Sequence, residues 1–253
     1  MKPFIGQHLV PGEKRFRWRG GEITRLEGFT DAVFAFAVTL LVVSLEVPRT
    51  FTELLMAMKG FVAFAICFAI LVQLWYQHYI FSRRYGLQTL YTVFLNSVLI
   101  FVALFFVYPL KFLFTLLVGG LSGGLLATHP LEKSIENSQV PLLMVIYSLG
   151  FSAVAAVFAL LYRYAYKLRH ELDLNEYEAL CTRHEIYNHM AMVTLGVLVA
   201  LNALLLPARI AGLSGFGFML IGVYYWIAGS VFGKRETLVW ERMQAQSGAS
   251  TSA

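Results

Sequence analysis

Residues 25–41 read RLEGFTDAVFAFAVTLL, an apolar run that follows directly on a short charged segment. This length approaches the roughly 20 residues that an α-helix needs to cross the hydrocarbon core of a bilayer. Asp31 lies inside the run, although a carboxylate within a membrane span costs about 2.5–3.5 kcal/mol on insertion scales. We therefore expect Asp31 to face protein or water and to find a partner. The alternative is an aspartate at the helix end that caps or anchors its own helix.

The rest of the chain has the same apolar character. Of its 253 residues, 58% are hydrophobic and 14% are charged, whereas soluble domains carry about a quarter charged residues. This composition excludes an ordinary water-soluble fold and predicts an all-α membrane protein. We expect one six-helix domain over residues 1–240 and a polar, disordered tail at 241–253. The six spans are expected at roughly 28–47, 58–80, 90–117, 141–162, 187–206 and 213–232.

The basic residues indicate how the chain is oriented. Fifteen of the 20 Lys and Arg residues fall on one side of the predicted spans, four fall on the other side, and Lys111 lies within the third span. Because cytoplasmic loops are enriched in Lys and Arg, we expect a multi-pass protein with both termini in the cytoplasm. The net charge of +5 then indicates contact with membrane lipids and no nucleic acid partner.

Two further polar residues lie in the next two spans. His78 of the second span and Asn96 of the third are expected toward the cytoplasmic ends of their helices, at the depth of Asp31. Each needs a hydrogen-bonding partner in a membrane. We hypothesise a polar clasp of Arg25, Asp31, His78 and Asn96 that fixes the first helix against the second and third. The alternative is a set of separate residues that water satisfies at the interface.

One face of the first helix carries a second pattern. Residues spaced three and four apart share a face of a helix, which groups Phe29, Ala32, Phe36, Thr39 and Val43 into one stripe. Such a stripe can line a pore, or it can pack against neighbouring helices. Periodicity alone favours packing.

The polar residues also form a recognisable motif. The first span carries Arg-x-x-x-Phe-(Ser/Thr)-Asp, the second Trp-x-x-His, and the third an Asn followed by a Pro toward its far end. This combination resembles the endosomal and lysosomal potassium channel family and its prokaryotic six-helix relatives. The residues that carry the resemblance are Arg25, Phe29, Thr30, Asp31, Trp75, His78, Asn96 and Pro109.

The resemblance implies a homotetrameric, potassium-permeable cation channel of a prokaryotic inner membrane, without a bound cofactor. In this family the first helices surround a central pore, there is no re-entrant filter loop, and a bulky apolar ring forms the constriction. The ring position falls on Phe36, and the threonine linked to potassium preference falls on Thr39, with Val43 further along the stripe. The family also packs the motif Arg and Asp against the second and third helices, which supports the clasp.

The sequence departs from the family pattern at two positions. Thr30 replaces the usual serine but keeps the hydroxyl group. Phe36 replaces an isoleucine or leucine. Hydrophobic gates work by dewetting, so four phenylalanine rings either block the constriction more fully or, by tilting, present a different aperture.

The sequence gives weaker support to other functions. A proton-coupled or other secondary transporter would use Asp31 and His78 as a relay, and a non-conducting scaffold would need neither residue. The Gly215-Phe216-Gly217 segment has no pore helix before it, so it indicates close helix approach and no filter. His184 and His189 are five apart, about 140° around a helix, so we expect neither a metal site nor an enzyme.

Overall fold

The protein is an all-helical membrane protein in the computed structural model, which describes residues 15–43, 47–128 and 135–251. In these ranges, six helices are long and apolar enough to cross a membrane, which confirms the six-helix prediction. They are α1 (Arg25–Val43), α3 (Phe61–Tyr85), α4 (Leu90–Leu121), α6 (Val140–Lys167), α7 (Glu176–Leu205) and α8 (Leu220–Thr251). Three shorter elements connect them within the described ranges: α2 (Phe51–Lys59), η1 (Asn137–Gln139) and η2 (Ala211–Met219).

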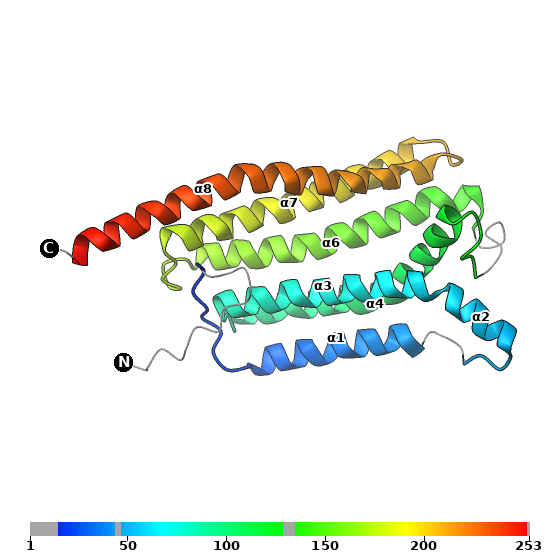
Figure 1. Ribbon diagram of the computed structural model, residues 1–253, viewed down its shortest axis with the longest axis horizontal. Coiled ribbons are helices and arrows are strands. Elements are labelled where there is room, and N and C mark those ends of the chain that lie inside the picture. Colours follow the sequence, from blue (N-terminus) through cyan, green and yellow to red (C-terminus); the bar gives the residue numbers. More distant parts are fainter. Residues whose placement is uncertain (1–14, 44–46, 129–134, 252–253) are drawn as a thin grey trace.

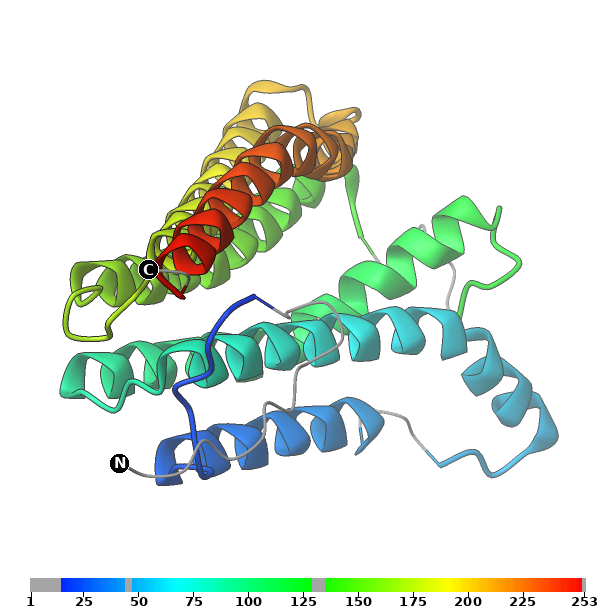
Figure 2. The same cartoon turned by 60° about the vertical axis from the view of Figure 1, so that its left-hand side comes forward.

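The six long helices form two groups of three. Helix α1 packs against α3 and α4, while α6 packs along α7, and α7 packs against α8. Contacts between α4 and α6 join the groups. Figure 1 shows α1 at one edge of the molecule and α8 at the opposite edge. Figure 2 shows the two groups crossing at an angle.

Local signals explain where α1 begins and where α4 bends. The Thr24 hydroxyl accepts a hydrogen bond from the Glu27 backbone N–H, and the Glu27 carboxylate accepts one from the Thr24 N–H. This reciprocal arrangement is a capping box. Pro109 lies inside α4, where the missing N–H and the ring disrupt the helix. The far part of α4 turns away from α3 (Figures 1 and 2), and the Tyr147 hydroxyl of α6 donates to the Pro109 carbonyl.

The largest differences from the sequence-based prediction lie at the start of α7 and at the end of α8. Helix α7 begins at Glu176, well before residue 187, because Asn175 and Glu178 form a second capping box that hydropathy does not detect. The segment 241–251, predicted to be disordered, continues α8 to Thr251. Extending a helix that is already nucleated costs little. Residues 252–253 of the predicted tail lie outside the described residues.

The glycines of η2 allow close packing, as the sequence indicated. A Cβ atom on Gly217 would lie 2.8 Å from a methyl group of Val199 on α7, and one on Gly215 would lie 3.0 Å from the terminal methyl of Met144 on α6. The segment is therefore pressed onto α6 and α7. The prediction of small residues for close helix approach is confirmed.

Candidate functional site

Helix α1 has one buried face and one exposed face. The buried face packs against α3 and α4 and consists of Thr30, Phe34, Ala37 and Leu41, together with Glu27 in the first turn. The other face is the predicted stripe, and the helices of the same chain leave it uncovered. Phe29 is 58% exposed, Phe36 55% and Val43 68%. Ordinary packing within one protomer therefore does not account for the stripe.

Thr39 is the polar position on this exposed face. Its hydroxyl donates to the Ala35 carbonyl at 2.9 Å. A hydroxyl that donates one hydrogen bond keeps two acceptor lone pairs. Thr39 can therefore offer oxygen to a passing cation without leaving its own donor unsatisfied.

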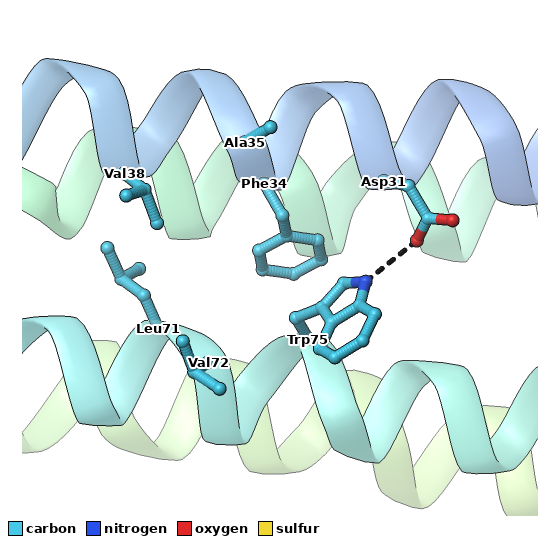
Figure 3. Close-up of a pocket in the computed structure, with 7 residues that line it drawn as sticks. All are labelled: Asp31, Phe34, Ala35, Val38, Leu71, Val72 and Trp75. Carbon is cyan, nitrogen blue, oxygen red and sulfur yellow. Dashed lines mark hydrogen bonds between the residues drawn. The ribbon is translucent and has the colours of Figure 1, made fainter.

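The predicted clasp divides into two separate pairs. Trp75 of α3 donates its indole N–H to Asp31 Oδ1 of α1 at 2.8 Å (Figure 3). His78 Nε2 of α3 lies 3.2 Å from Asn96 Oδ1 of α4, and both residues are buried. The Phe34 ring, 6.5 Å from the His78 ring, packs beside the second pair. One pair thus ties α1 to α3, and the other ties α3 to α4.

Three motif residues take other positions. Arg25 is exposed, and its side chain makes no hydrogen bond or ion pair with the residues that the structure describes. The buried Thr30 hydroxyl donates to the Leu26 carbonyl at 2.8 Å, so its hydrogen bond lies within its own helix. Phe29 is exposed on the stripe. Asp31 does not cap α1, because Thr24 and Glu27 do so.

A cleft of about 350 Å³ lies between α1 and α3 beside the Asp31–Trp75 hydrogen bond (Figure 3). Apart from the Asp31 carboxylate, its walls are almost entirely apolar. They consist of Asp31, Phe34, Ala35, Val38, Leu71, Val72 and Trp75. Helix α1 is therefore incompletely packed against α3 along this side.

Sequence reasoning missed a set of contacts near the start of α1. Arg17 and Arg19 both bind Glu178, whose side chain is 0% exposed. The hydrogen bond to Glu178 raises the pKa of Arg17, and burial opposes this rise. The pattern Asn175-x-x-Glu178 in the sequence signals the capping box, but no local pattern pairs residue 17 with residue 178. In the sequence-based prediction, Arg17 and Arg19 contribute only to the count of basic residues that indicates orientation.

Similarity to known proteins covers the same helices. A family model described as the endosomal/lysosomal potassium channel TMEM175 matches residues 25–107. A potassium channel from Marivirga tractuosa is 41% identical over 237 residues, which cover 91% of this chain and 96% of the relative. The chain belongs to the TMEM175 family. The matched range contains the motif residues from Arg25 to Asn96.

Two solved TMEM175 structures show the same architecture. The crystal structure of a variant of the potassium channel MtTMEM175, bound to a nanobody–MBP fusion protein, matches with a TM-score of 0.77 and 40% identity, and covers 89% of this chain and 99% of that one. A lysosomal potassium-selective channel TMEM175 homolog from Chamaesiphon minutus matches with a TM-score of 0.50 and 23% identity, over 84% of this chain and 96% of that one. The second match bears on the fold alone. The family resemblance and the all-helical fold inferred from sequence are confirmed.

Proposed function

We propose that this TMEM175 family member is a potassium-permeable cation channel in which α1 of each protomer lines the ion pathway. Phe36 forms the hydrophobic constriction, Thr39 contributes to potassium preference, and Val43 continues the lining. No cofactor takes part, and potassium is the permeant ion. A relative 41% identical, itself named a potassium channel, supports the function.

The observation that carries this proposal is the uncovered stripe on α1. An apolar helix face that its own chain does not cover needs another neighbour, such as lipid, a second copy or an aqueous pore. Here the stripe belongs to the helix that also bears the family motif. A single helix cannot enclose a pathway, so several protomers must place their α1 helices around one axis. We propose a homotetramer, as the family resemblance implies.

We further propose that the channel resides in a prokaryotic inner membrane with both termini in the cytoplasm. The distribution of Lys and Arg supports this orientation. It places the Asp31–Trp75 and His78–Asn96 pairs toward the cytoplasmic side and Phe36 deeper along α1.

A proton-coupled transporter is the second candidate, with Asp31 and His78 as the relay. In the structure these two residues hydrogen-bond to different partners, Trp75 and Asn96, and not to each other. Each side chain has a structural role in joining two helices. The geometry therefore favours the channel over the relay.

Potassium flux into liposomes tests the channel proposal. We expect Phe36→Ala to raise cation flux and to relax selectivity, because removing the ring widens the constriction and lowers the cost of wetting it. Phe101→Ala is the matched control, since Phe101 is 68% exposed but lies on α4. Unchanged flux in Phe36→Ala would place the constriction elsewhere. Flux coupled to a proton gradient would support the transporter.

A further inference from the structure

The segment that leads into α1 crosses the molecule before it reaches that helix. We call residues 16–21 the N-terminal strap. Dark blue in Figures 1 and 2, it runs from the region where α6 joins α7, past the end of α3, to the start of α1. Its first residue, Phe16, is 5% exposed and packs edge-on against Tyr85 of α3 with ring centroids 5.7 Å apart. The strap is thus anchored in the core that joins the two helix groups.

A buried charge cluster holds the strap on α7. Arg17 binds Glu178 through two parallel contacts, Nε to Oε1 at 3.1 Å and Nη2 to Oε2 at 3.0 Å. Arg19 Nη2 lies 2.6 Å from Oε2, and the Arg17 backbone N–H donates to Oε1 at 2.8 Å. Because the Glu178 carboxylate is completely buried, losing its partners would leave an uncompensated charge. This cluster is therefore far more sensitive to substitution than an exposed ion pair.

The strap also binds the end of α3 through its backbone. The N–H groups of Arg19 and Gly20 both donate to the Arg83 carbonyl at 3.0 Å. The Arg83 guanidinium donates in return to the Gly21 carbonyl at 2.8 Å. A Cβ atom on Gly20 would lie 2.8 Å from the Ser82 carbonyl oxygen, whereas one on Gly21 would meet nothing within 4 Å. The approach at residue 20 therefore requires glycine.

An aromatic series continues from the strap to α1. Trp18 contacts Tyr79 of α3 edge-on, with ring centroids 6.3 Å apart. Tyr79 stacks on Trp75 at 5.8 Å, and Trp75 donates to Asp31. The position of α7 is thereby linked to Asp31 through directly touching groups. The chain itself provides a second link, because the strap enters α1 only a few residues later.

We infer that the N-terminal strap is a positioning element that holds the start of the pore helix and so sets the aperture at Phe36. Arg17, Arg19, Gly20 and Glu178 act through α1 and touch no permeating ion. The cleft between α1 and α3 gives α1 room to move on a face other than the stripe. Releasing the strap lets α1 shift into that space and widens the constriction. This inference rests on the proposed function, in which α1 lines the pathway.

A matched pair of glycine substitutions tests the strap in the full-length protein. Gly20→Ala pushes the strap off α3, and Gly21→Ala adds the same methyl group one residue later without a clash. We expect Gly20→Ala to raise potassium flux into liposomes at least about fivefold, the lower end of couplings between sites. Gly21→Ala should match the parent protein. Equal flux in the two variants would overturn the inference.

The Phe36→Ala background separates positioning from general destabilisation. If the strap acts by setting the Phe36 aperture, Gly20→Ala has little effect once the ring is gone. The same fold-change in both backgrounds would refute the strap's action on the constriction. If Phe36→Ala alone changes nothing while Gly20→Ala still raises flux, the constriction is refuted and control of flux by the strap is supported. If Phe36→Ala raises flux while Gly20→Ala changes nothing, the role of the strap is refuted and the constriction at Phe36 is supported.

A second pair of variants tests the same inference if Gly20→Ala fails to fold. Glu178→Gln removes the charge that Arg17 and Arg19 bind, and Glu176→Gln makes the same change at an exposed position in the first turn of α7. We expect faster amide hydrogen exchange at the start of α1 in Glu178→Gln, together with increased flux, and neither in Glu176→Gln. If Glu178→Gln instead loses protection from amide hydrogen exchange uniformly across all helices, and flux in the folded fraction is unchanged, the charge cluster has a purely structural role and the inference is overturned.

Discussion

The α6–α7 pair and the α1–α3 pair are packed in opposite ways. Between α6 and α7 the backbones approach closely, so that a Cβ atom on Gly196 would lie 2.2 Å from Ser152 Oγ and 2.8 Å from the Ser148 carbonyl oxygen. Between α1 and α3 there is instead a cleft of about 350 Å³ and one side-chain hydrogen bond, from Trp75 to Asp31. The α6–α7 pair is held by close backbone packing, whereas the α1–α3 pair is held by an apolar cluster along part of its length and by that hydrogen bond.

This difference assigns separate roles to the two helix groups. Tight packing of small residues drives association of helices within a membrane, where lipid competes with apolar side chains. The α6–α7 pair therefore forms a rigid support. Elements that move are drawn from less densely packed regions, and α1 belongs to such a region. The polar residues Asp31, Trp75, His78 and Asn96 lie within the looser group, where they tie α1 to α3 and α3 to α4.

The largest expected effect comes from filling the close contact of the rigid pair. Gly196→Leu introduces a side chain whose first carbon already collides with the α6 backbone. Overpacking a core with extra methylenes costs about 1–3 kcal/mol, and this clash adds to that cost. We expect little folded, monodisperse protein by size-exclusion chromatography.

Gly222→Leu on α8 is the control for this substitution. A Cβ atom on Gly222 would meet nothing within 4 Å. Because glycine is a poor helix former, this variant should be as stable as the parent or slightly more stable. Equal recovery of the two variants would contradict the assignment of α6–α7 as the rigid support.

An intermediate effect is expected at the hydrogen bond that ties α1 to α3. Trp75→Phe keeps an aromatic ring but removes the donor to Asp31, which leaves a carboxylate without that partner. Unsatisfied buried groups cost about 1–3 kcal/mol, and Asp31 is partly buried. We expect a lower thermal unfolding temperature and altered potassium flux.

Asp31→Asn sharpens this prediction, because the amide oxygen still accepts the indole N–H while the charge is lost. If the residue serves as an acceptor, Asp31→Asn retains most of the stability and flux, and Asp31→Ala loses both. A proton relay would behave differently, since the amide cannot carry a proton at neutral pH. Complete loss of transport in a stable Asp31→Asn protein would therefore favour the transporter.

For the group of α1, α3 and α4, the sequence predicts the membrane spans and the polar residues that need partners, but not which residues pair. Hydropathy identifies the spans because membrane insertion depends on composition, and Asp31, His78 and Asn96 need partners wherever they lie. Which partner each residue meets depends on side-chain directions between helices. The sequence predicts a clasp that includes Arg25, whereas the Trp75 indole binds Asp31. Periodicity could not reveal this choice.

The contacts of the N-terminal strap could not be predicted from the sequence, because they join residues far apart in the chain. Arg17 and Glu178 are separated by 161 positions, and no local pattern joins them. As indicators of membrane orientation, the strap's arginines contribute only the sign of their charge. By contrast, the capping patterns Thr24-x-x-Glu27 and Asn175-x-x-Glu178 are local, so both helix starts could have been predicted from the sequence.

The smallest effect on stability is expected at Thr39, because its side chain is exposed and its hydrogen bond lies within α1. Thr39→Val keeps the shape of the side chain and removes only a hydroxyl that donates to Ala35 within the same helix. Exposed substitutions of this kind change the free energy of unfolding by about 0.5 kcal/mol or less. We therefore expect an unchanged unfolding temperature but a weaker preference for potassium over sodium, measured as the ratio of the two fluxes in liposomes. Thr194→Val on α7 is the control, because its exposed hydroxyl also donates within its helix, to Met190. If both variants keep the parent's flux ratio, Thr39 does not contribute to selectivity, although α1 can still line the pathway.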